Sequence, residues 1–263
     1  MRSRLTAIPV VIVALLVAGA AIVGFAPAEH PPAPAAVTVT RPAARPEVRL
    51  VGAWPAPPEK PKHPTSFLVA DAIGPTVGLY AEPEVPYAER PSMDNPTHEG
   101  LPVVFRVLDD RGEWLRVQVS MRPNGFEAWV RSDEVSLRRV PNWIEVELST
   151  RTVRAFHGDT ELFRTTSVVG SDRTPTPVGT FFVDGWVPLS GSGPYGAGQI
   201  SVAGFSEVLT SFGGGVGQIA IHGTNRPELM GSAVSNGCVR LVDDDLRHLA
   251  LLAPLGTPVV VKA

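Results

Sequence analysis

Apolar side chains occupy every second position in several short stretches of this chain, a pattern typical of strands that bury one face. In two such stretches the inward series is Val103, Phe105, Val107 and Leu115, Val117, Val119, with Val104, Arg106 and Leu108 expected on the opposite face of the first. The turn sequence Asp109-Asp110-Arg111-Gly112 separates the two stretches, and a second turn sequence, Arg122-Pro123-Asn124-Gly125, follows them. The pattern predicts a small all-β domain over residues 66–139.

A second β region begins near residue 142. Ile144, Val146 and Leu148 alternate with polar residues, and His157-Gly158-Asp159 is a turn sequence after which residues 162–169 predict a returning strand. Residues 184–217 are rich in Gly and Ser, which indicates a long irregular segment, either a binding loop or an ordinary surface excursion.

One strand and one helix are predicted near the C-terminus. The apolar run Gln218 to Ile221 predicts a short buried strand with His222 at its end. The helix is indicated by apolar residues that share one face at helical spacing, with an N-terminal cap and a terminating proline: Leu246, Leu249, Ala250 and Ala253, capped by Asp243 and ended by Pro254.

The N-terminus has the pattern of an export segment. Basic Arg2 and Arg4 precede the almost wholly apolar stretch from Leu5 to Phe25, and Ala26-Pro27-Ala28 fits a small-residue cleavage site. Because the apolar stretch is also close to the ~20 residues that cross a bilayer, residues 1–28 are expected to be a cleaved signal peptide or a retained membrane anchor. In both cases the rest of the chain lies outside the cytoplasm, in the cell envelope.

Residues 29–65 predict a linker, and the composition and motifs of the whole chain indicate which partners and cofactors are not expected. Residues 29–65 are rich in Pro and Ala, which predicts an extended linker without a packed core. Hydrophobic residues make up 44% of the chain and the net charge is −3, and no basic stripe or RNA-binding motif occurs, so nucleic acid is not expected as a partner. No zinc-binding spacing such as His-Glu-x-x-His and no phosphate-binding glycine fingerprint occurs, so we expect neither a metal nor a cofactor.

Cys238 is the one cysteine among the 263 residues, so it cannot form an internal disulfide. A thiol attacks a carbonyl only as the thiolate, and an imidazole can take its proton or hold it as an ion pair. His222 precedes Cys238 by 16 positions, enough for a strand, a turn and a return segment to bring the two side chains together. The alternative is that Cys238 is simply a small buried hydrophobic residue.

The residues around Cys238 favour the nucleophile. Gly237 removes side-chain bulk, so that backbone N–H groups can approach a reacting carbonyl as an oxyanion hole. Arg240 adds a positive charge suited to a substrate carboxylate, and its alternative role is a structural ion pair. The hydroxyl of Ser235 is better suited to stabilising the turn than to moving a proton.

Three ordered motifs carry a family resemblance. His222-Gly223-Thr224 followed by Ser235-x-Gly237-Cys238-Val239-Arg240-Leu241 resembles the signature of L,D-transpeptidases with a YkuD-type catalytic domain. Pro175-Thr176-Pro177-Val178-Gly179-Thr180-Phe181 and Thr257-Pro258-Val259-Val260-Val261 resemble two further segments of that family, and the likeness covers about residues 142–263. This chain departs from many members in having Asn236, where they have histidine before the Gly-Cys pair.

The resemblance implies a reaction on peptidoglycan stem peptides. Cys238 would attack the carbonyl of the third residue of a tetrapeptide donor, release D-alanine and form a thioester, which an amine of a neighbouring stem resolves as a 3→3 cross-link. His222 would be the base, oriented by the carbonyl of Gly223, and carbapenem-type β-lactams would inhibit. Residues expected to contact the substrate are Arg240, Ser235, Thr224, Asn236 and Tyr195. Resolution by water or by a protein amine gives two rival enzymes, a carboxypeptidase and a protein-to-wall ligase. A wall-binding protein with a vestigial site is a third reading.

The segment before the catalytic region has a resemblance of its own. Gly112-x-Trp114-Leu115-x-Val117 together with Gly125-x-x-Ala128-Trp129-Val130 resembles bacterial SH3-like (SH3b) domains. The expected architecture is therefore mainly β. A YkuD-like β-sandwich catalytic domain over residues 140–263 follows a small SH3-like β-barrel over residues 66–139.

Overall fold

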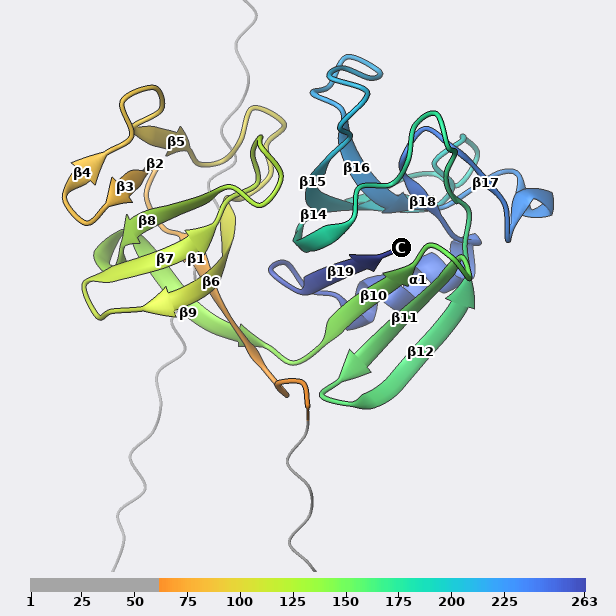
Figure 1. Ribbon diagram of the computed structural model, residues 1–263, viewed down its shortest axis with the longest axis horizontal. Coiled ribbons are helices and arrows are strands. Elements are labelled where there is room, and N and C mark those ends of the chain that lie inside the picture. The colour runs from red at the N-terminus through yellow and green to blue at the C-terminus, as the bar shows by residue number, and fades with distance from the viewer. Residues whose placement is uncertain (1–61) are drawn as a thin grey trace, which may run out of the picture. The chain divides into compact units, whose positions relative to one another are not determined.

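The computed structural model describes residues 62–263, which belong to one compact unit (Figure 1). The predicted signal or anchor segment, residues 1–28, and most of the predicted linker, residues 29–65, lie outside the described residues. Among residues 62–263, no helix is both long enough and apolar enough to cross a membrane.

The first half of the described chain, here called the N-terminal lobe, is all β. Its strands are β1 (Phe67–Ala72), β2 (Thr76–Gly78), β3 (Tyr80–Glu82), β4 (Val85–Pro86), β5 (Ser92–Asp94), β6 (Val104–Asp110), β7 (Trp114–Gln118), β8 (Glu127–Arg131) and β9 (Val135–Val140). Seven of them form one sheet in the order β4-β3-β8-β7-β6-β1-β9, while β2 and β5 pair separately. The all-β prediction for this segment is confirmed, and its assignment as SH3b-like stays a prediction.

The second half, here called the C-terminal lobe, contains the one α-helix of the described residues. Its elements are β10 (Trp143–Glu147), β11 (Thr152–His157), β12 (Thr160–Thr166), β13 (Val169–Gly170), β14 (Gly179–Pro188), β15 (Gly198–Phe205), β16 (Gln218–His222), β17 (Ala233–Ser235), β18 (Val239–Arg240), α1 (Asp243–Leu252) and β19 (Pro258–Lys262). Eight strands are linked in the order β12-β11-β10-β19-β14-β15-β16-β18. The mainly β fold class is confirmed.

Strand β14 turns the large sheet because it pairs with different neighbours along its length. Residues 179–182 pair with β19, and residues 183–188 pair with β15. The register shifts between Val183 and Gly185, a β-bulge that bends the strand at Asp184. Helix α1 packs Leu246 and Leu249 into the same apolar core as strands β10, β14, β15 and β16.

Two predictions on this lobe were wrong in detail. Residues 184–217 are not one irregular segment, because β14 continues to Pro188 and β15 spans Gly198–Phe205, which leaves two loops, 189–197 and 206–217. The prediction failed because the many glycines and serines of residues 184–217 are typical of loops, although part of this segment forms two strands. Asp243 does not cap α1: the capping position is Val242, and Asp243 is the first helical residue.

The two lobes share a small apolar interface. Val104 lies on the face of β6 opposite Phe105 and is buried in a cluster that joins both lobes: Val69, Val104, Val140, Phe182 and Ala203. Beside this cluster, the side chain of Gln118 donates a hydrogen bond to the carbonyl of Thr180 at 2.7 Å. The face of β6 that contains Val104 therefore packs against the C-terminal lobe.

Candidate active site

The predicted nucleophile and base line one small cavity in the C-terminal lobe. The cavity has a volume of about 150 Å³ and is lined by Pro194, Tyr195, Phe212, His222, Asn236, Cys238 and Arg240. Strand pairing explains this convergence, because β16 and β18 are parallel neighbours with Ile221 opposite Val239 and His222 opposite Arg240. Cys238 directly precedes β18, so the chain sets it beside the end of β16.

His222 is buried and its ring is held by the backbone. Its Nδ1 lies 2.7 Å from the carbonyl oxygen of Gly223. A carbonyl oxygen can only accept, so Nδ1 carries the proton and Nε2 is left as the acceptor. Burial lowers the pKa of His222 to about 4; the positive charge of Arg240 acts in the same direction, and the bond to Gly223 opposes both. His222 is therefore a neutral imidazole near pH 7.

Close packing requires a glycine at position 223, the residue whose carbonyl holds the His222 ring. A Cβ built on this residue would lie 2.2 Å from Oδ1 of Asp243 and 2.9 Å from the backbone nitrogen of Ala197. Such distances leave no room for any side chain, so the segment that orients His222 depends on a glycine at this position.

Cys238 lies at the end of a tightly bonded turn. The hydroxyl of Ser235 donates to the carbonyl of Cys238 at 2.5 Å and accepts from the amide of Gly237 at 3.1 Å. Gly237 has φ of 114°, a left-handed value that favours glycine. Thr176 supports the turn from the opposite side, because its hydroxyl donates to the carbonyl of Gly237 at 2.9 Å. These hydrogen bonds fix the backbone of the turn and therefore the position of the Cys238 thiol.

The surroundings of the thiol favour its protonated form. Burial raises the pKa of Cys238, and a hydrogen bond with the backbone of Ala220 and the charge of Arg240 only partly oppose this. Since the pKa of His222 is lowered at the same site, the resting state is a neutral thiol beside a neutral imidazole rather than a thiolate–imidazolium pair.

Arg240 brings a positive charge to the cavity without a carboxylate partner. Among residues 62–263 no ion pair involves its guanidinium, and its buried Nε has no hydrogen-bond partner. This geometry does not match the alternative role of Arg240 in a structural ion pair. It leaves the charge free to meet an anionic ligand.

The other residues expected to contact substrate divide into two groups. Tyr195 and Asn236 line the cavity, with the Tyr195 ring centroid 4.6 Å from that of His222. Thr224 and Ser235 do not line it: the Thr224 hydroxyl accepts from the amide of Arg226 at 3.0 Å, and the Ser235 hydroxyl is used within the turn. The amide of Gly237, expected in an oxyanion hole, already donates to Ser235.

Three residues at the site were not predicted to belong to it. Pro194 and Phe212 line the cavity from loops 189–197 and 206–217, and Thr176 supports the Gly237 turn. Thr176 belongs to a segment already recognised as resembling the family. Phe212 stands in a Gly-rich loop without periodicity, so no local pattern marks it.

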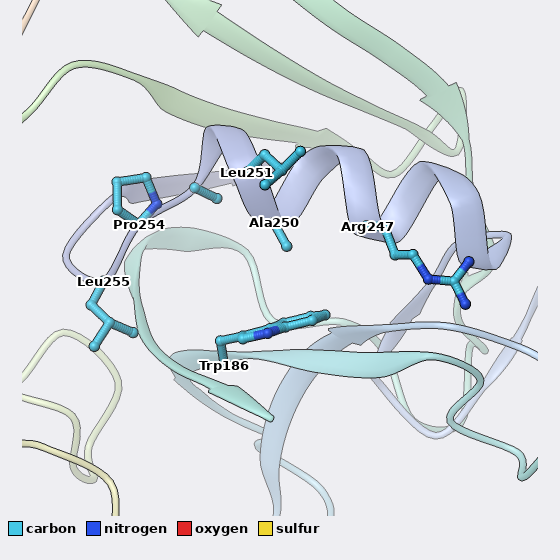
Figure 2. Close-up of a pocket in the computed structure, with 7 residues that line it drawn as sticks. Trp186, Arg247, Ala250, Leu251, Pro254 and Leu255 are labelled. Atoms are coloured by element: carbon cyan, nitrogen blue, oxygen red, sulfur yellow. The ribbon is translucent and has the colours of Figure 1, made fainter. Parts of the chain in front are cut away.

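A larger cavity of about 590 Å³ lies elsewhere in the lobe, between α1 and β14. Figure 2 shows the indole of Trp186 lying across from α1, with Ala250 pointing toward it. The rest of the lining is apolar apart from Arg247, which has no basic lone pair at neutral pH. Because this cavity contains no nucleophile or base, the smaller one is the candidate active site.

Comparison with known proteins gives a consistent family. A family model described as the L,D-transpeptidase catalytic domain, YkuD, matches residues 141–261. The chain is 35% identical over 122 residues to YkuD of Bacillus licheniformis and 31% identical over 123 residues to YkuD of Bacillus subtilis. These matches cover 46% and 47% of this chain and 66% and 67% of the two relatives, so the chain spans about two thirds of their length.

Solved structures of similar proteins include L,D-transpeptidase 3 from Mycobacterium tuberculosis in complex with a faropenem-derived adduct. That match has 15% sequence identity and a TM-score of 0.39, and it covers 60% of this chain and 97% of the other.

Proposed function

Because this chain belongs to the YkuD family of L,D-transpeptidases, we propose that it is a peptidoglycan L,D-transpeptidase that forms 3→3 cross-links through a thioester on Cys238. The observation that carries the proposal is the shared cavity of Cys238 and His222, where the bond from Nδ1 to Gly223 leaves Nε2 as the proton acceptor.

Acylation begins when the Sγ of Cys238 attacks the carbonyl carbon of the third, L-configured residue of a tetrapeptide stem. His222 accepts the thiol proton at Nε2 as the carbon–sulfur bond forms. The tetrahedral intermediate collapses by breaking the carbon–nitrogen bond to the terminal D-alanine. His222 then returns the proton to the leaving amine, and a thioester remains on Cys238.

Deacylation repeats these steps with a different amine. The side-chain amine on the third residue of a neighbouring stem attacks the thioester, and His222 removes its proton. The carbon–sulfur bond breaks, the thiol is regenerated and the new amide is the 3→3 cross-link. A single base that is neutral at rest serves both half-reactions.

The neutral resting pair sets how the thiol is activated. With the pKa of Cys238 raised and that of His222 lowered, proton transfer accompanies attack instead of preceding it. His222 then acts as a general base in the transition state. The amide of Cys238 is the oxyanion donor in this proposal, since the amide of Gly237 is already engaged.

In this proposal, the guanidinium of Arg240 binds a carboxylate of the stem peptide. Stem peptides carry carboxylates, and a guanidinium at the cavity that has no ion-pair partner among residues 62–263 suits them. Asn236 and Tyr195 form part of the same lining and are proposed to contact the stem. Carbapenem-type β-lactams are proposed inhibitors, because their reactive amide carbonyl would be attacked by the same thiol.

The proposed substrate lies in the bacterial cell envelope, so we place the enzyme outside the cytoplasm. The basic Arg2 and Arg4 and the apolar stretch from Leu5 to Phe25 support export, with the segment either cleaved or retained as an anchor.

Product analysis tests the reaction. The purified protein is incubated with a disaccharide tetrapeptide, and the products are separated by liquid chromatography and identified by mass spectrometry. We expect a dimer joined between third residues together with free D-alanine, and neither product with Cys238→Ala. Tripeptide without dimer would instead identify a carboxypeptidase, and no turnover by a folded protein would contradict an enzymatic role.

A further inference from the structure

We propose that the N-terminal lobe completes the active-site cavity: Arg122 and Asn124 hold the loop 206–217, whose Phe212 forms one wall beside Cys238. The expected effect on the reaction with substrate rests on the proposed function. The contacts of Arg122 and Asn124 with loop 206–217 do not depend on that function. Arg122 and Asn124 are positioning residues, since they act through Phe212 and line no part of the cavity.

Loop 206–217 is an extension of the hairpin formed by β15 and β16, and it projects beyond the sheet (Figure 1). Its base is closed by a hydrogen bond from the amide of Ser206 to the carbonyl of Gly217 at 2.8 Å. Its tip is closed by two backbone bonds between Phe212 and Gly215, of 3.0 and 2.9 Å, around Gly213 and Gly214, which have positive φ. Backbone hydrogen bonds thus close the loop at its base and at its tip, and Phe212 lies at the tip.

Asn124 fixes the start of this loop. Its side-chain nitrogen donates to the carbonyl of Phe205 at 2.8 Å, and the amide of Phe205 donates to its side-chain oxygen at 2.7 Å. The side-chain amide therefore pairs with both backbone groups of the last residue of β15, as a neighbouring strand would. Asn124 belongs to the turn between β7 and β8 in the N-terminal lobe.

Arg122 ties the two arms of the loop together. Its Nη2 donates to the carbonyl of Leu209 at 3.2 Å and to the carbonyl of Val216 at 3.1 Å. Its guanidinium carbon also lies 5.3 Å from the ring centroid of Phe205. The arms approach closely here, because a Cβ on Gly217 would lie 2.0 Å from the carbonyl oxygen of Leu209. One charged donor thus satisfies a carbonyl on each arm.

The two carbonyls that Arg122 holds, on Leu209 and Val216, lie three and four residues from Phe212. The Phe212 side chain is 47% exposed, so the cavity wall it forms is held mainly through the backbone of its loop. Cys238 and His222, in contrast, are fixed by the sheet and the Ser235 turn. Loss of the anchors should therefore displace the wall and leave the Cys238–His222 pair in place, which affects a large donor more than a small reagent.

The test compares Arg122→Ala and Asn124→Ala with a matched control, Arg139→Ala. Arg139 is an exposed arginine of the same lobe, and within the described part of the chain its side chain donates a hydrogen bond only to Ser66. Hydrogen–deuterium exchange should accelerate in residues 206–217 for the two test variants and stay at the wild-type rate for the control. Acylation of Cys238 by imipenem and by the tetrapeptide donor should fall, by up to about 100-fold if the wall moves by about 1 Å. Alkylation by the small reagent iodoacetamide should change far less.

Two further variants separate positioning from general destabilisation. Phe212→Ala should reproduce the loss of acylation, and combining it with Arg122→Ala should add little, because both act through the same wall. Arg122→Lys, which keeps a charged donor, should recover part of the acylation rate.

Unchanged exchange in residues 206–217, or an equal loss toward imipenem and iodoacetamide, would overturn the proposal. If the wild-type protein formed no acyl-enzyme, the proposed function would fail, and the exchange measurement would still decide whether the N-terminal lobe holds the loop.

Discussion

The Nδ1 of His222 lies 2.7 Å from the carbonyl oxygen of Gly223, the next residue in the chain. This contact sets the tautomer of the imidazole without a carboxylate, so the base needs no third charged residue. The same glycine packs against Asp243 at the start of α1, which links the orientation of the ring to the start of the helix.

Replacing His222 with alanine should lower the acylation rate by at least ~100-fold, the usual contribution of a positioned general base. Stopped-flow acylation by a carbapenem measures the rate, and thermal melting checks that the variant is folded. A folded His222→Ala protein that is acylated at nearly the wild-type rate would remove His222 from the mechanism.

The pH dependence of acylation should reflect the lowered pKa of His222. Protonated imidazole cannot accept the thiol proton, so the rate should be level through neutral pH and fall in acid with a midpoint near the pKa of about 4. A midpoint at the ordinary histidine value would show that the ring of His222 is solvated. It would contradict the assignment of His222 as a buried base with a lowered pKa.

The stability of the folded protein should show the same shift. Because the folded-state pKa of His222 lies below its ordinary value of 6.5, the unfolded chain binds more protons between pH 6.5 and about 4. The contribution of His222 is therefore present above pH 6.5 and lost as the pH falls through this window. Denaturant unfolding of wild type and His222→Gln across the window measures the difference, and identical pH dependence in both would contradict the shift.

Asp184 is a second group with a shifted pKa, and its substitution should change stability in a predictable direction. It lies at the β14 bulge, accepts a hydrogen bond from Gln218 at 2.7 Å and bonds to Ser120 of the N-terminal lobe, and burial raises its pKa. Asp184→Asn keeps an acceptor oxygen and removes a charge that is costly to bury, so it should be at least as stable as wild type at pH 7.

The matched variant Asp184→Ala should be less stable by about 1–3 kcal/mol, because it removes the acceptor shared by the Ser120 hydroxyl and the half-buried side chain of Gln218. A raised folded-state pKa means that the contribution of Asp184 is present at low pH and lost as the pH rises through that value, and Asp184→Asn should lack this dependence. If both variants are equally destabilised at pH 7, the carboxylate itself is needed at the interface.

Arg240→Lys keeps the positive charge and loses the planar fork, so it should be acylated more slowly than wild type by the anionic stem peptide. Alkylation of Cys238 by a small neutral reagent should change far less, because no carboxylate is recognised. Parallel measurement of both reactions and of the melting temperature checks this. Equal losses with a lowered melting temperature would indicate that Arg240 is structural.

The parts of the fold that follow short-range patterns were predictable from sequence. Alternating apolar residues located the strands that contain Ile144 and Phe105, and the run before His222 located β16. The spacing of His222 and Cys238 left room for the two side chains to meet, and the parallel pairing of β16 with β18 shows how they and Arg240 come to line one cavity.

The features that sequence did not predict depend on contacts between distant segments. Val104 is buried because the C-terminal lobe covers it, and the alternation of its own strand contains no sign of that partner. Phe212 reaches the cavity because Arg122, 90 positions earlier, holds its loop. The amide of Gly237 is occupied by Ser235, a local contact that depends on side-chain rotation rather than on residue type.

The most direct test of the account is the intact mass of the purified protein after reaction with a carbapenem, followed by peptide mapping. The account predicts one covalent adduct per chain, located on Cys238, and no adduct on Cys238→Ala. An adduct that persists in Cys238→Ala, or a folded wild-type protein that remains unmodified, would contradict the assignment of Cys238 as the nucleophile.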